Sequence, residues 1–321
     1  MSDLSRNAVN PDRPYLVLRE LEAALGGKTA SILTIFLTAS ECPVGCSMCD
    51  LWRNTTIAPT AKGAIPRQIA WAMNDRDSPV SSVETGPIVY DGEDPSASRF
   101  RTRSRRALNL ESVVKLYNSG NFFDPRSIPP VDYLAIAEQV QRFDRVVVEN
   151  HPRFGGKRLN RFRALIHGDL EVAVGLETVQ PRWLARMKKG MTRDDFDRYA
   201  ETLQRSGVRL RVFLIVGVPG VGVSESKRWA MLSARHAIMR GAVHVALIPC
   251  RTGNGWSESG WNANLPDINA SVLCDIQQEL IRWADGHAVV TVDTWDMNDG
   301  GKERRLARQQ IERLNEVQGN S

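Results

Sequence analysis

The sequence predicts an α/β fold, a partial (β/α)6 TIM-like barrel with helical extensions at its N- and C-terminal ends. Three observations predict it: short apolar segments alternate with segments of helical period, turns separate them, and polar stretches follow the apolar segments. Strands that alternate with helices form right-handed βαβ units and hence a parallel sheet. The 321 residues, 42% of them hydrophobic, predict one domain over residues 1–321, with its core at about 30–250 and a C-terminal extension at 250–321.

The N-terminal region predicts a helix, a strand and a second helix. Residues 15–27, YLVLRELEAALGG, follow a helical pattern that two glycines close. Residues 30–39 are apolar and rich in isoleucine, leucine and threonine, which predicts the first, buried strand of the barrel. Residues 63–76 predict a helix that starts near Pro66, and residues 75–106, rich in Ser, Pro, Asp and Gly, predict an irregular insert.

From residue 112 onward the alternation becomes regular. The segments that predict strands and their turns lie at 112–120, 145–151, 170–178, 208–220, 242–250 and 287–293. The segments that predict helices lie at 130–143, 158–168, 192–207, 224–241, 271–286 and 302–318, and Thr192 is the expected N-cap of the third. Six strand units, counted from residues 30–39, precede the last strand-like segment, which fits a barrel better than a short open sheet.

Polar and glycine-rich stretches follow six of the predicted strands. In chain order they are ECPVGC, YNSGNF, VENHPRF, GLETV, VGVPGV and PCRTGNGW. Because the carboxyl ends of parallel strands meet at one edge of a sheet, we expect these six stretches to build the active site together.

Three of the five cysteines lie in or just after the first of these stretches, as Cys42, Cys46 and Cys49. A structural zinc site requires four protein ligands, and the other two cysteines are isolated, although Cys250 follows a predicted strand and is an available fourth ligand. Inert core thiols are a poor fit to a loop that also contains proline, glycine and serine. The spacing C-x3-C-x2-C therefore favours an iron–sulfur cluster over a zinc site.

Three thiolates are one fewer than a cubane [4Fe–4S] cluster normally takes. They leave one iron with an open coordination position, which is a feature of catalytic rather than structural metal sites. We therefore expect a small chelating molecule to bind this iron.

The C-x3-C-x2-C spacing after the first strand of a β/α barrel resembles the signature of the radical S-adenosylmethionine (SAM) superfamily. The resemblance implies a [4Fe–4S] cluster held by Cys42, Cys46 and Cys49, with the amino and carboxylate groups of SAM on the open iron. It also implies reductive cleavage of SAM to a 5′-deoxyadenosyl radical that abstracts a hydrogen atom from the substrate. An electron donor such as flavodoxin or ferredoxin is a further implied partner.

The same resemblance assigns SAM-binding residues at the next two strand ends. Asn118, Ser119 and Gly120 stand where the superfamily has a glycine-rich motif for the methionine amino group, but here the glutamate that usually ends this motif is missing. Glu149 and Asn150 end the following strand, where the resemblance implies contacts with ribose hydroxyls or with the methionine moiety. A surface carboxylate is the alternative for Glu149.

Further residues are assigned in the same way at later strand ends and in the cysteine stretch itself. Glu177 in GLET is a second polar candidate for cofactor binding, with a surface carboxylate again as the alternative. Gly217 and Pro219 lie in LIVGVPG, which resembles a segment whose backbone contacts adenine. Met48 stands where the superfamily often has an aromatic residue, and the resemblance implies that its side chain packs on an adenine face.

Longer phrases resemble one subgroup of this superfamily. FLTASECPVGCSMCDLW, KLYNSGNFFDPRSIP and VGLETVQPRWLARMKKGMTRDDF are similar to the Elongator-like radical proteins, and more closely to the radical partner proteins of archaeosine formation in tRNA. The likeness covers roughly residues 30–250 and implies a tRNA or a modified nucleoside as substrate, with a free small molecule as the alternative. The sequence has no second cysteine cluster, which disfavours activities that use auxiliary clusters.

Charge and hydropathy indicate which kinds of binding partner and which compartment to expect. The net charge of +5 is mildly basic, and residues 99–106, RFRTRSRR, contain five arginines. This run is either a solvated loop or a phosphate-binding patch. No apolar run approaches the ~20 residues that span a bilayer, so we expect no membrane partner. The first residues lack the apolar segment of a secretory signal, so we expect a cytoplasmic protein.

Residues 250–262, CRTGNGWSESGWN, leave a predicted strand end and contain two tryptophans. They form either a packed surface loop or an aromatic wall, with Trp256, against a planar substrate.

Three classes of protein remain open: a radical SAM enzyme, an electron-transfer iron–sulfur protein with a fourth ligand, and a zinc-stapled binding module.

Overall fold

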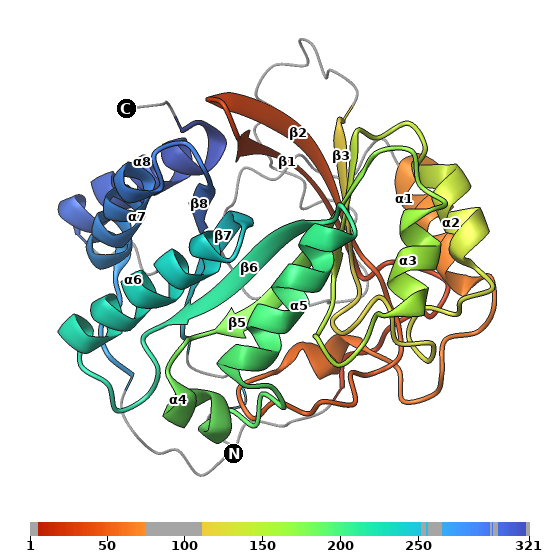
Figure 1. The fold of residues 1–321 in the computed structure, drawn as a ribbon, viewed down its shortest axis with the longest axis horizontal. Coiled ribbons are helices and arrows are strands. Elements are labelled where there is room, and N and C mark those ends of the chain that lie inside the picture. The colour runs from red at the N-terminus through yellow and green to blue at the C-terminus, as the bar shows by residue number, and fades with distance from the viewer. Residues whose placement is uncertain are drawn as a thin grey trace, which may run out of the picture.

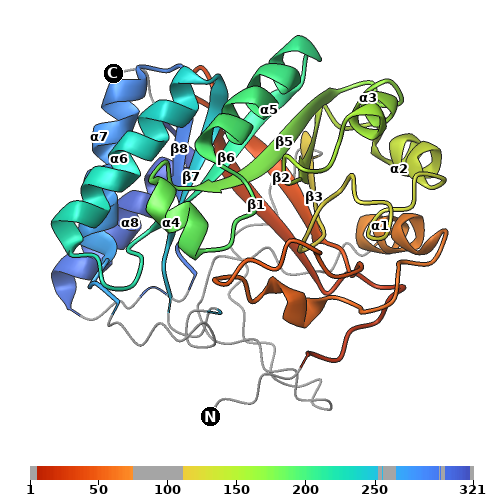
Figure 2. The same cartoon turned by 60° about the horizontal axis from the view of Figure 1, so that its bottom comes forward.

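The computed structural model describes residues 6–74, 111–251, 255, 265–295, 297 and 301–318. Within these ranges eight strands form one sheet, in the order β1 to β8. β1 runs antiparallel to β2, and every later pair of neighbours is parallel. The sheet curls, and the helices lie around its outer face (Figure 1, Figure 2). The predicted α/β fold with a partial barrel is therefore confirmed.

The strands are β1 (Leu16–Ala24), β2 (Lys28–Phe36), β3 (Val113–Tyr117), β4 (Arg145–Glu149), β5 (Asp169–Glu177), β6 (Arg209–Val216), β7 (Ala242–Pro249) and β8 (Val289–Val292). The helices are α1 (Ala64–Asn74), α2 (Tyr133–Val140), α3 (Lys157–Arg163), α4 (Pro181–Arg186), α5 (Arg193–Arg205), α6 (Val223–Met239), α7 (Ala270–Ala284) and α8 (Lys302–Glu316), with one 3-10 helix, η1 (Leu51–Asn54). Thr192 caps α5 as predicted, since its hydroxyl accepts the Asp195 N–H at 3.2 Å. Helix α4 is absent from the sequence prediction, because its six residues are too few to show a helical period.

The predicted N-terminal helix at residues 15–27 is wrong. Leu16–Ala24 forms strand β1, which pairs with β2 along its whole length. Gly26 and Gly27 make the turn between the two strands, with φ of +76° and +70°. The leucines, glutamates and alanines of this segment favour helices. In strand β1, however, Glu22 points into the barrel, where buried cations bind it. This tertiary contact outweighs the local helix preference.

The C-terminal elements complete the sheet and cover its edge. β8 pairs with β7 in parallel, so the strand-like segment at 287–293 belongs to the same sheet as the six barrel strands. The predicted C-terminal helix at 302–318 is confirmed by α8, which packs against α7, β1 and β8. In the ranges that the structure describes, no helix has the length and apolar character needed to cross a membrane.

The interior of the barrel holds a network of buried charges. Arg211 on β6 binds Glu171 on β5, with Nε 2.6 Å from Oε1, and Glu22 on β1, with Nη2 2.8 Å from Oε1. Lys115 on β3 binds Glu20 at 3.0 Å and also contacts Glu22. Burial by itself would raise the pKa of Glu22, but Arg211 and Lys115 outweigh it and hold that pKa well below its usual range. The carboxylate therefore stays ionised.

This network can form only because the sheet curls, and its ion pairs in turn hold the sheet in that curl. Four strands separate β1 from β6 in the sheet order, yet Glu22 and Arg211 meet side chain to side chain. Arg211 and Glu171 lie near the amino ends of their strands, whereas the candidate site residues follow the carboxyl ends. The charged network therefore lies toward the amino ends of the parallel strands, away from the edge where the predicted site lies. We call it the floor of the barrel.

We expect that removing Arg211, the central cation of this floor, strongly lowers the stability of the fold. Arg211→Met leaves the carboxylates of Glu22 and Glu171 buried without their main partner, and should lower the free energy of unfolding by about 3–5 kcal/mol in urea titrations. Arg205→Met is the matched control, because this guanidinium is 70% exposed and pairs with Glu201 on the same helix. The control should cost less than about 0.5 kcal/mol. Equal losses in the two variants would contradict the importance of the network.

Candidate functional site

The cysteine loop (residues 37–50) follows β2 at the carboxyl edge of the sheet. Cys42, Cys46 and Cys49 lie in it, each partly buried and with a free thiol. The Cys49 N–H donates to the Cys46 carbonyl oxygen at 3.1 Å, which closes a tight turn. Gly45 has a φ of +65°, a conformation that favours glycine. Local turn geometry therefore gathers the three thiols on one short segment.

Burial disfavours ionisation of two of the loop thiols, Cys46 and Cys49. Burial raises the pKa of the Cys46 thiol, and it raises the pKa of the Cys49 thiol to about 12. A metal cation reverses this preference, because its charge outweighs the effect of burial and a coordinating thiol loses its proton. The two thiols therefore become strong nucleophilic ligands only together with a metal.

Two residues fasten the cysteine loop to the connector between β5 and α5. The Ser47 N–H donates to the Met187 carbonyl oxygen at 2.9 Å, and the Ser47 hydroxyl donates to the Arg186 carbonyl oxygen at 3.1 Å. Met48 is only 8% exposed and packs in an apolar cluster with Trp183 and Met187. A flexible methionine suits an irregular apolar space of this kind. The structure thus places Met48 among protein side chains that anchor the loop.

The structure brings Asn118, Ser119 and Gly120 together with Glu149. Oε1 of Glu149 accepts the N–H of Asn118 at 2.7 Å and the N–H of Gly120 at 3.0 Å. Ser119 has a φ of +53°, and its hydroxyl hydrogen-bonds with the Tyr15 hydroxyl at 2.8 Å. Both polar atoms of the Asn118 amide are buried, and neither has a hydrogen-bond partner among the described residues. Such an amide is costly in a folded protein and fits a position that meets a polar ligand.

Gly120 and Glu149 border the first cysteine. A Cβ at position 120 would contact Cβ of Cys42 at 3.5 Å, so the β3 connector lies directly beside this thiol. Burial raises the pKa of Glu149 to about 7, although the backbone N–H donors of the β3 connector lower it in part. Glu149 is therefore held inside the mouth of the barrel and is not a free surface carboxylate.

The structure does not bring the Asn150 side chain to that of Glu149. Consecutive residues of a strand point to opposite faces, and Asn150 points outward. Its Nδ2 donates to the carbonyl oxygens of His151 and Phe154, each at 2.8 Å, and lies 2.9 Å from the Tyr199 hydroxyl. These three contacts use the Asn150 amide nitrogen and hold the connector after β4 in shape. A contact between Asn150 and SAM stays a prediction.

Glu177 forms a buried ion pair at the end of β5. Its Oε1 lies 2.6 Å from Nζ of Lys189, and its φ is +64°, which is unusual for a residue other than glycine. A Cβ at Gly175 would collide with both charged groups, so the pair occupies the space that this glycine leaves. Burial lowers the pKa of Lys189, but its neighbours, with the Glu177 carboxylate the largest of them, raise it by more. A permanent positive charge therefore lies near Cys46.

Gly217 and Pro219 follow β6 at the same edge of the sheet. Gly217 has a φ of +88°, and a Cβ there would collide with the side chain of Ile268, so both backbone and packing require glycine. The Cys250 N–H donates to the Val216 carbonyl oxygen at 2.8 Å, which joins the ends of β6 and β7. The contact of this segment with adenine stays a prediction.

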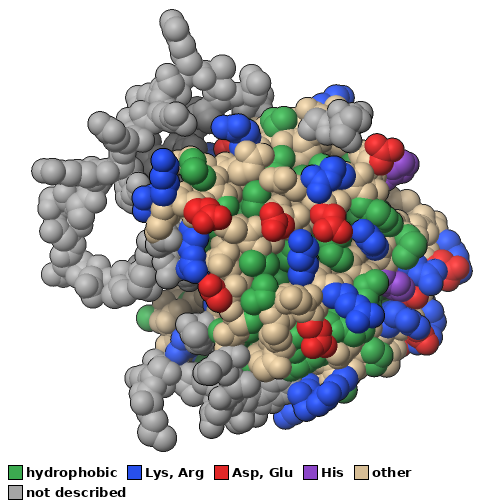
Figure 3. Space-filling model, turned by 90° about the vertical axis from the view of Figure 1, so that its left-hand side faces the viewer, with side chains coloured by type: hydrophobic (Ala, Val, Ile, Leu, Met, Phe, Trp, Pro, Cys, Tyr) green, Lys and Arg blue, Asp and Glu red, His purple; other side chains and the backbone are tan. Residues whose placement is uncertain are grey.

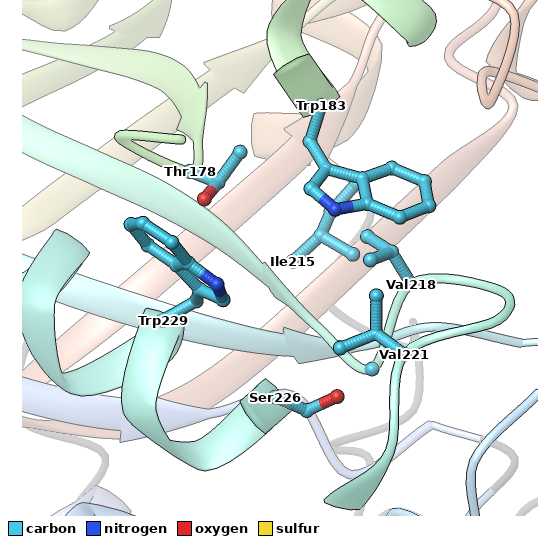
Figure 4. A pocket seen from close by; sticks show the side chains of 8 residues that line it. Thr178, Trp183, Ile215, Val218, Val221, Ser226 and Trp229 are labelled. Carbon is cyan, nitrogen blue, oxygen red and sulfur yellow. The ribbon is translucent and has the colours of Figure 1, made fainter. Parts of the chain in front are cut away.

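A pocket lies between α4, the connectors after β5 and β6, and α6. Figure 4 shows the rings of Trp183 and Trp229 on either side of Ile215, with Ser226 below them. Trp183 also belongs to the apolar cluster that buries Met48. The pocket and the cysteine loop therefore share one wall.

The connector after β7 reaches the cysteine loop at Gly255. A Cβ there would lie 2.7 Å from the Ser47 carbonyl oxygen and 3.1 Å from that of Cys49, so a side chain does not fit. Trp256 and most of the predicted aromatic wall lie outside the described residues, as does the arginine run at 99–106.

Three further polar residues lie at this edge that the sequence did not predict as site residues: Asn121, Lys189 and Tyr15. Asn121 donates from Nδ2 to Sγ of Cys42 at 3.1 Å, and its position in YNSGNF was the available signal. Lys189 lies in MKKG after the unpredicted helix α4, where a basic pair before glycine marks a helix end. Tyr15 gives no signal, because its partner Ser119 is 104 residues away in the sequence.

The donor set fits a [4Fe–4S] cluster held by three thiolates. Within the described part of the chain, no three His, Cys, Asp or Glu side chains converge where a single metal ion could bind. A cubane cluster makes a different demand, because each thiolate binds a different iron atom. Three thiols on one loop, an amide donor at Cys42 and the Lys189 ammonium near Cys46 suit such a negatively charged group.

Comparison with known proteins gives partial similarities. No family model matches the chain. It is 30% identical over 142 residues to archaeosine synthase subunit beta of Methanosarcina acetivorans, covering 40% of this chain and 41% of that protein. It is 24% identical over 147 residues to an uncharacterized protein of Methanocaldococcus jannaschii, covering 44% of this chain and 40% of that protein. The resemblance to the radical proteins of archaeosine formation is thereby confirmed.

The alignments span about two fifths of the length of these curated relatives. Among solved structures, the Elp3 of Methanocaldococcus infernus, with its N-terminus deleted, superposes with a TM-score of 0.44 and 16% sequence identity. That superposition covers 63% of this chain and 54% of the other.

The approach of Gly255 predicts that the cysteine loop is sensitive to a single added methyl group. In Gly255→Ala the new Cβ displaces the Ser47 and Cys49 carbonyls, so alkylation of the partly buried Cys49 thiol in the metal-free protein should become several-fold faster. Mass spectrometry of the alkylated peptides measures the rate. Gly222→Ala is the matched control, because its Cβ would meet no atom within 4 Å. Unchanged labelling in Gly255→Ala would contradict the close contact.

Proposed function

We propose that the protein is a radical SAM enzyme that modifies a nucleoside in tRNA. In this proposal Cys42, Cys46 and Cys49 hold a [4Fe–4S] cluster whose fourth iron binds SAM. When bound, this pair of cofactors supplies a 5′-deoxyadenosyl radical, formed by one-electron cleavage of SAM, for hydrogen abstraction. The observation that carries the proposal is the three-thiol loop beside Gly120 and Glu149 at the carboxyl edge of a parallel barrel.

The residues around the cysteine loop have the chemistry to bind SAM. The Asn118 amide offers one donor and one acceptor group that no residue in the described ranges uses. The Lys189 ammonium attracts a carboxylate, and the carboxylates of Glu149 and Glu177 accept hydrogen bonds from hydroxyl groups. In the proposal the backbone of Gly217 and Pro219 contacts the adenine ring. Met48 holds the cysteine loop in position through its apolar packing.

The proposal includes an external reductant such as flavodoxin or ferredoxin, since cleavage of SAM consumes one electron. A reducing compartment such as the cytoplasm suits free thiols and a metal cluster. The remaining alternatives are a radical SAM enzyme for a free small molecule, an electron-transfer iron–sulfur protein, and a zinc-stapled binding module.

Similarity to archaeosine synthase subunit beta supports tRNA as the substrate class. The charges around the cysteine loop support it independently. Residues 150–168 and 178–193, the connectors after β4 and β5, contain five Lys and Arg residues each and no Asp or Glu. The two connectors meet at Gly190, whose added Cβ would lie 3.3 Å from Nη2 of Arg153 and 3.4 Å from Cγ1 of Val44 in the cysteine loop. These two basic connectors therefore border the cysteine loop.

Three cations of the first connector, Arg153, Lys157 and Arg161, are exposed and form no ion pair with the described residues. By contrast, the face formed by α6, α7 and α8 mixes basic and acidic side chains, so that each sign screens the other (Figure 3). Unpaired cations on one side of a site attract a phosphate backbone, whereas a mixed surface does not.

The cluster assignment predicts that each loop cysteine is essential and that other cysteines are not. Cys42→Ala, Cys46→Ala and Cys49→Ala should each lose bound iron after anaerobic reconstitution and form no 5′-deoxyadenosine from SAM with dithionite. The control Cys274→Ala, on α7, should retain both properties. Iron analysis and liquid chromatography measure them.

The alternatives give different results in the same experiment. About one zinc per chain with no iron would favour the binding module. Loss of the cluster in Cys250→Ala would favour a four-cysteine electron-transfer site. A fully loaded cluster that yields no 5′-deoxyadenosine would disprove the radical SAM assignment.

The substrate assignment predicts that the basic connector binds tRNA. Changing Arg153, Lys157 and Arg161 together to alanine should weaken tRNA binding and lower the slope of log K against log salt by about 0.9 for each lost phosphate contact. Cleavage of SAM without substrate should be unchanged. Fluorescence anisotropy at several salt concentrations measures binding.

A matched triple variant controls for the loss of net charge. Arg228, Arg282 and Arg305 are exposed on α6, α7 and α8, and their combined change to alanine should leave tRNA binding near the wild-type value. Equal weakening in both triple variants would show non-specific attraction and would count against the tRNA assignment.

A further inference from the structure

Asn121 joins the cysteine loop to the connectors after β3 and β4. Its Nδ2 donates to Sγ of Cys42 at 3.1 Å, and its Oδ1 accepts the N–H of His151 at 2.8 Å. The residue is 1% exposed, so water does not compete for either contact. A single buried amide therefore links one candidate cluster ligand to two strand ends.

The contact with His151 fixes which end of the amide faces the sulfur. A backbone N–H can only donate, so the atom opposite it must be the amide oxygen. The nitrogen end of Asn121 consequently faces Cys42, and no flip of the amide satisfies both neighbours. Because an amide nitrogen carries only donor hydrogens, the contact is an N–H···S hydrogen bond with the sulfur as acceptor.

His151 is itself held at both ring nitrogens. Its Nδ1 accepts the N–H of Arg153 at 3.1 Å, so Nε2 carries the hydrogen and donates to the Lys189 carbonyl oxygen at 2.9 Å. Burial and the charge of Lys189 lower the pKa of His151 to about 4, which keeps the ring neutral. The backbone of His151 is thus immobilised, and it immobilises the Asn121 amide in turn.

We propose that Asn121 is a positioning residue that donates a hydrogen bond to the Cys42 thiolate of the cluster and raises the reduction potential of that cluster. The inference rests on the proposed function. Reduction adds one electron and makes the ligand sulfurs more negative, so a donor to one sulfur stabilises the reduced state more than the oxidised state. Exclusion of water strengthens the effect.

Two substitutions separate the two hydrogen bonds of Asn121. Asn121→Asp keeps an oxygen that accepts the His151 N–H but replaces the donor group with a second oxygen. Asn121→Ala removes both hydrogen bonds. Asn54→Ala is the matched control, since Asn54 follows Cys49 by only five positions and its side-chain oxygen Oδ1 accepts a hydrogen bond from the Asn7 amide.

The midpoint potential of the reconstituted cluster is the direct measurement. Each variant is loaded with iron and sulfide anaerobically, titrated with dithionite in the presence of mediators, and followed by electron paramagnetic resonance. We expect a lower potential in Asn121→Ala and a still lower one in Asn121→Asp, because the carboxylate adds a negative charge beside the sulfur. Asn54→Ala should match the wild type.

The possible outcomes separate this inference from the proposed function. A purely structural role for Asn121 would reduce iron per chain but leave the potential of the remaining cluster unchanged, which would overturn the inference alone. Unchanged iron and unchanged potential in both variants would do the same. Failure of the wild-type chain to assemble any iron–sulfur cluster would overturn both.

Discussion

Arg211 binds the carboxylates of Glu22 and Glu171 inside the barrel, and the rest of the architecture depends on this buried arrangement. It ties the first strand to the fifth and sixth, so the curl of the sheet is fixed by charge as well as by the apolar core. Charges in such a place are costly to separate and leave few alternative arrangements of the strands. The strand carboxyl ends above this floor are therefore held at fixed positions relative to one another.

The candidate site uses that fixed frame through contacts between neighbouring connectors. Glu149 holds the backbone of residues 118–120, Asn121 spans from Cys42 to His151, and Lys189 joins His151 through its carbonyl group and Glu177 through its ammonium. Each connector is thus supported by the next one around the barrel. The groups that we propose to face a cofactor are oriented by neighbouring residues, which is the arrangement that precise binding sites require.

The sequence predicts what depends on local spacing and misses what depends on distant partners. The three cysteines share one loop, and the rule for parallel strand ends correctly brings Asn118 and Glu149 to one edge. Strand β1 was misread because its residues favour a helix locally, while the cations that hold Glu22 in the barrel lie 93 and 189 residues further along the chain. Lys189 and Asn121 acquire their roles only through contacts across connectors, for which no sequence period exists.

The anchors of the cysteine loop have a consequence for metal loading. Ser47 is held by backbone groups of the β5 connector, and Glu41 by the Thr56 carbonyl oxygen at 2.9 Å, and neither contact uses a thiol. In small zinc modules the metal supplies the folding energy, and its removal unfolds the chain. Here the conformational entropy of the loop is already lost when the barrel folds. Loss of the proposed cluster is therefore expected to leave the barrel folded.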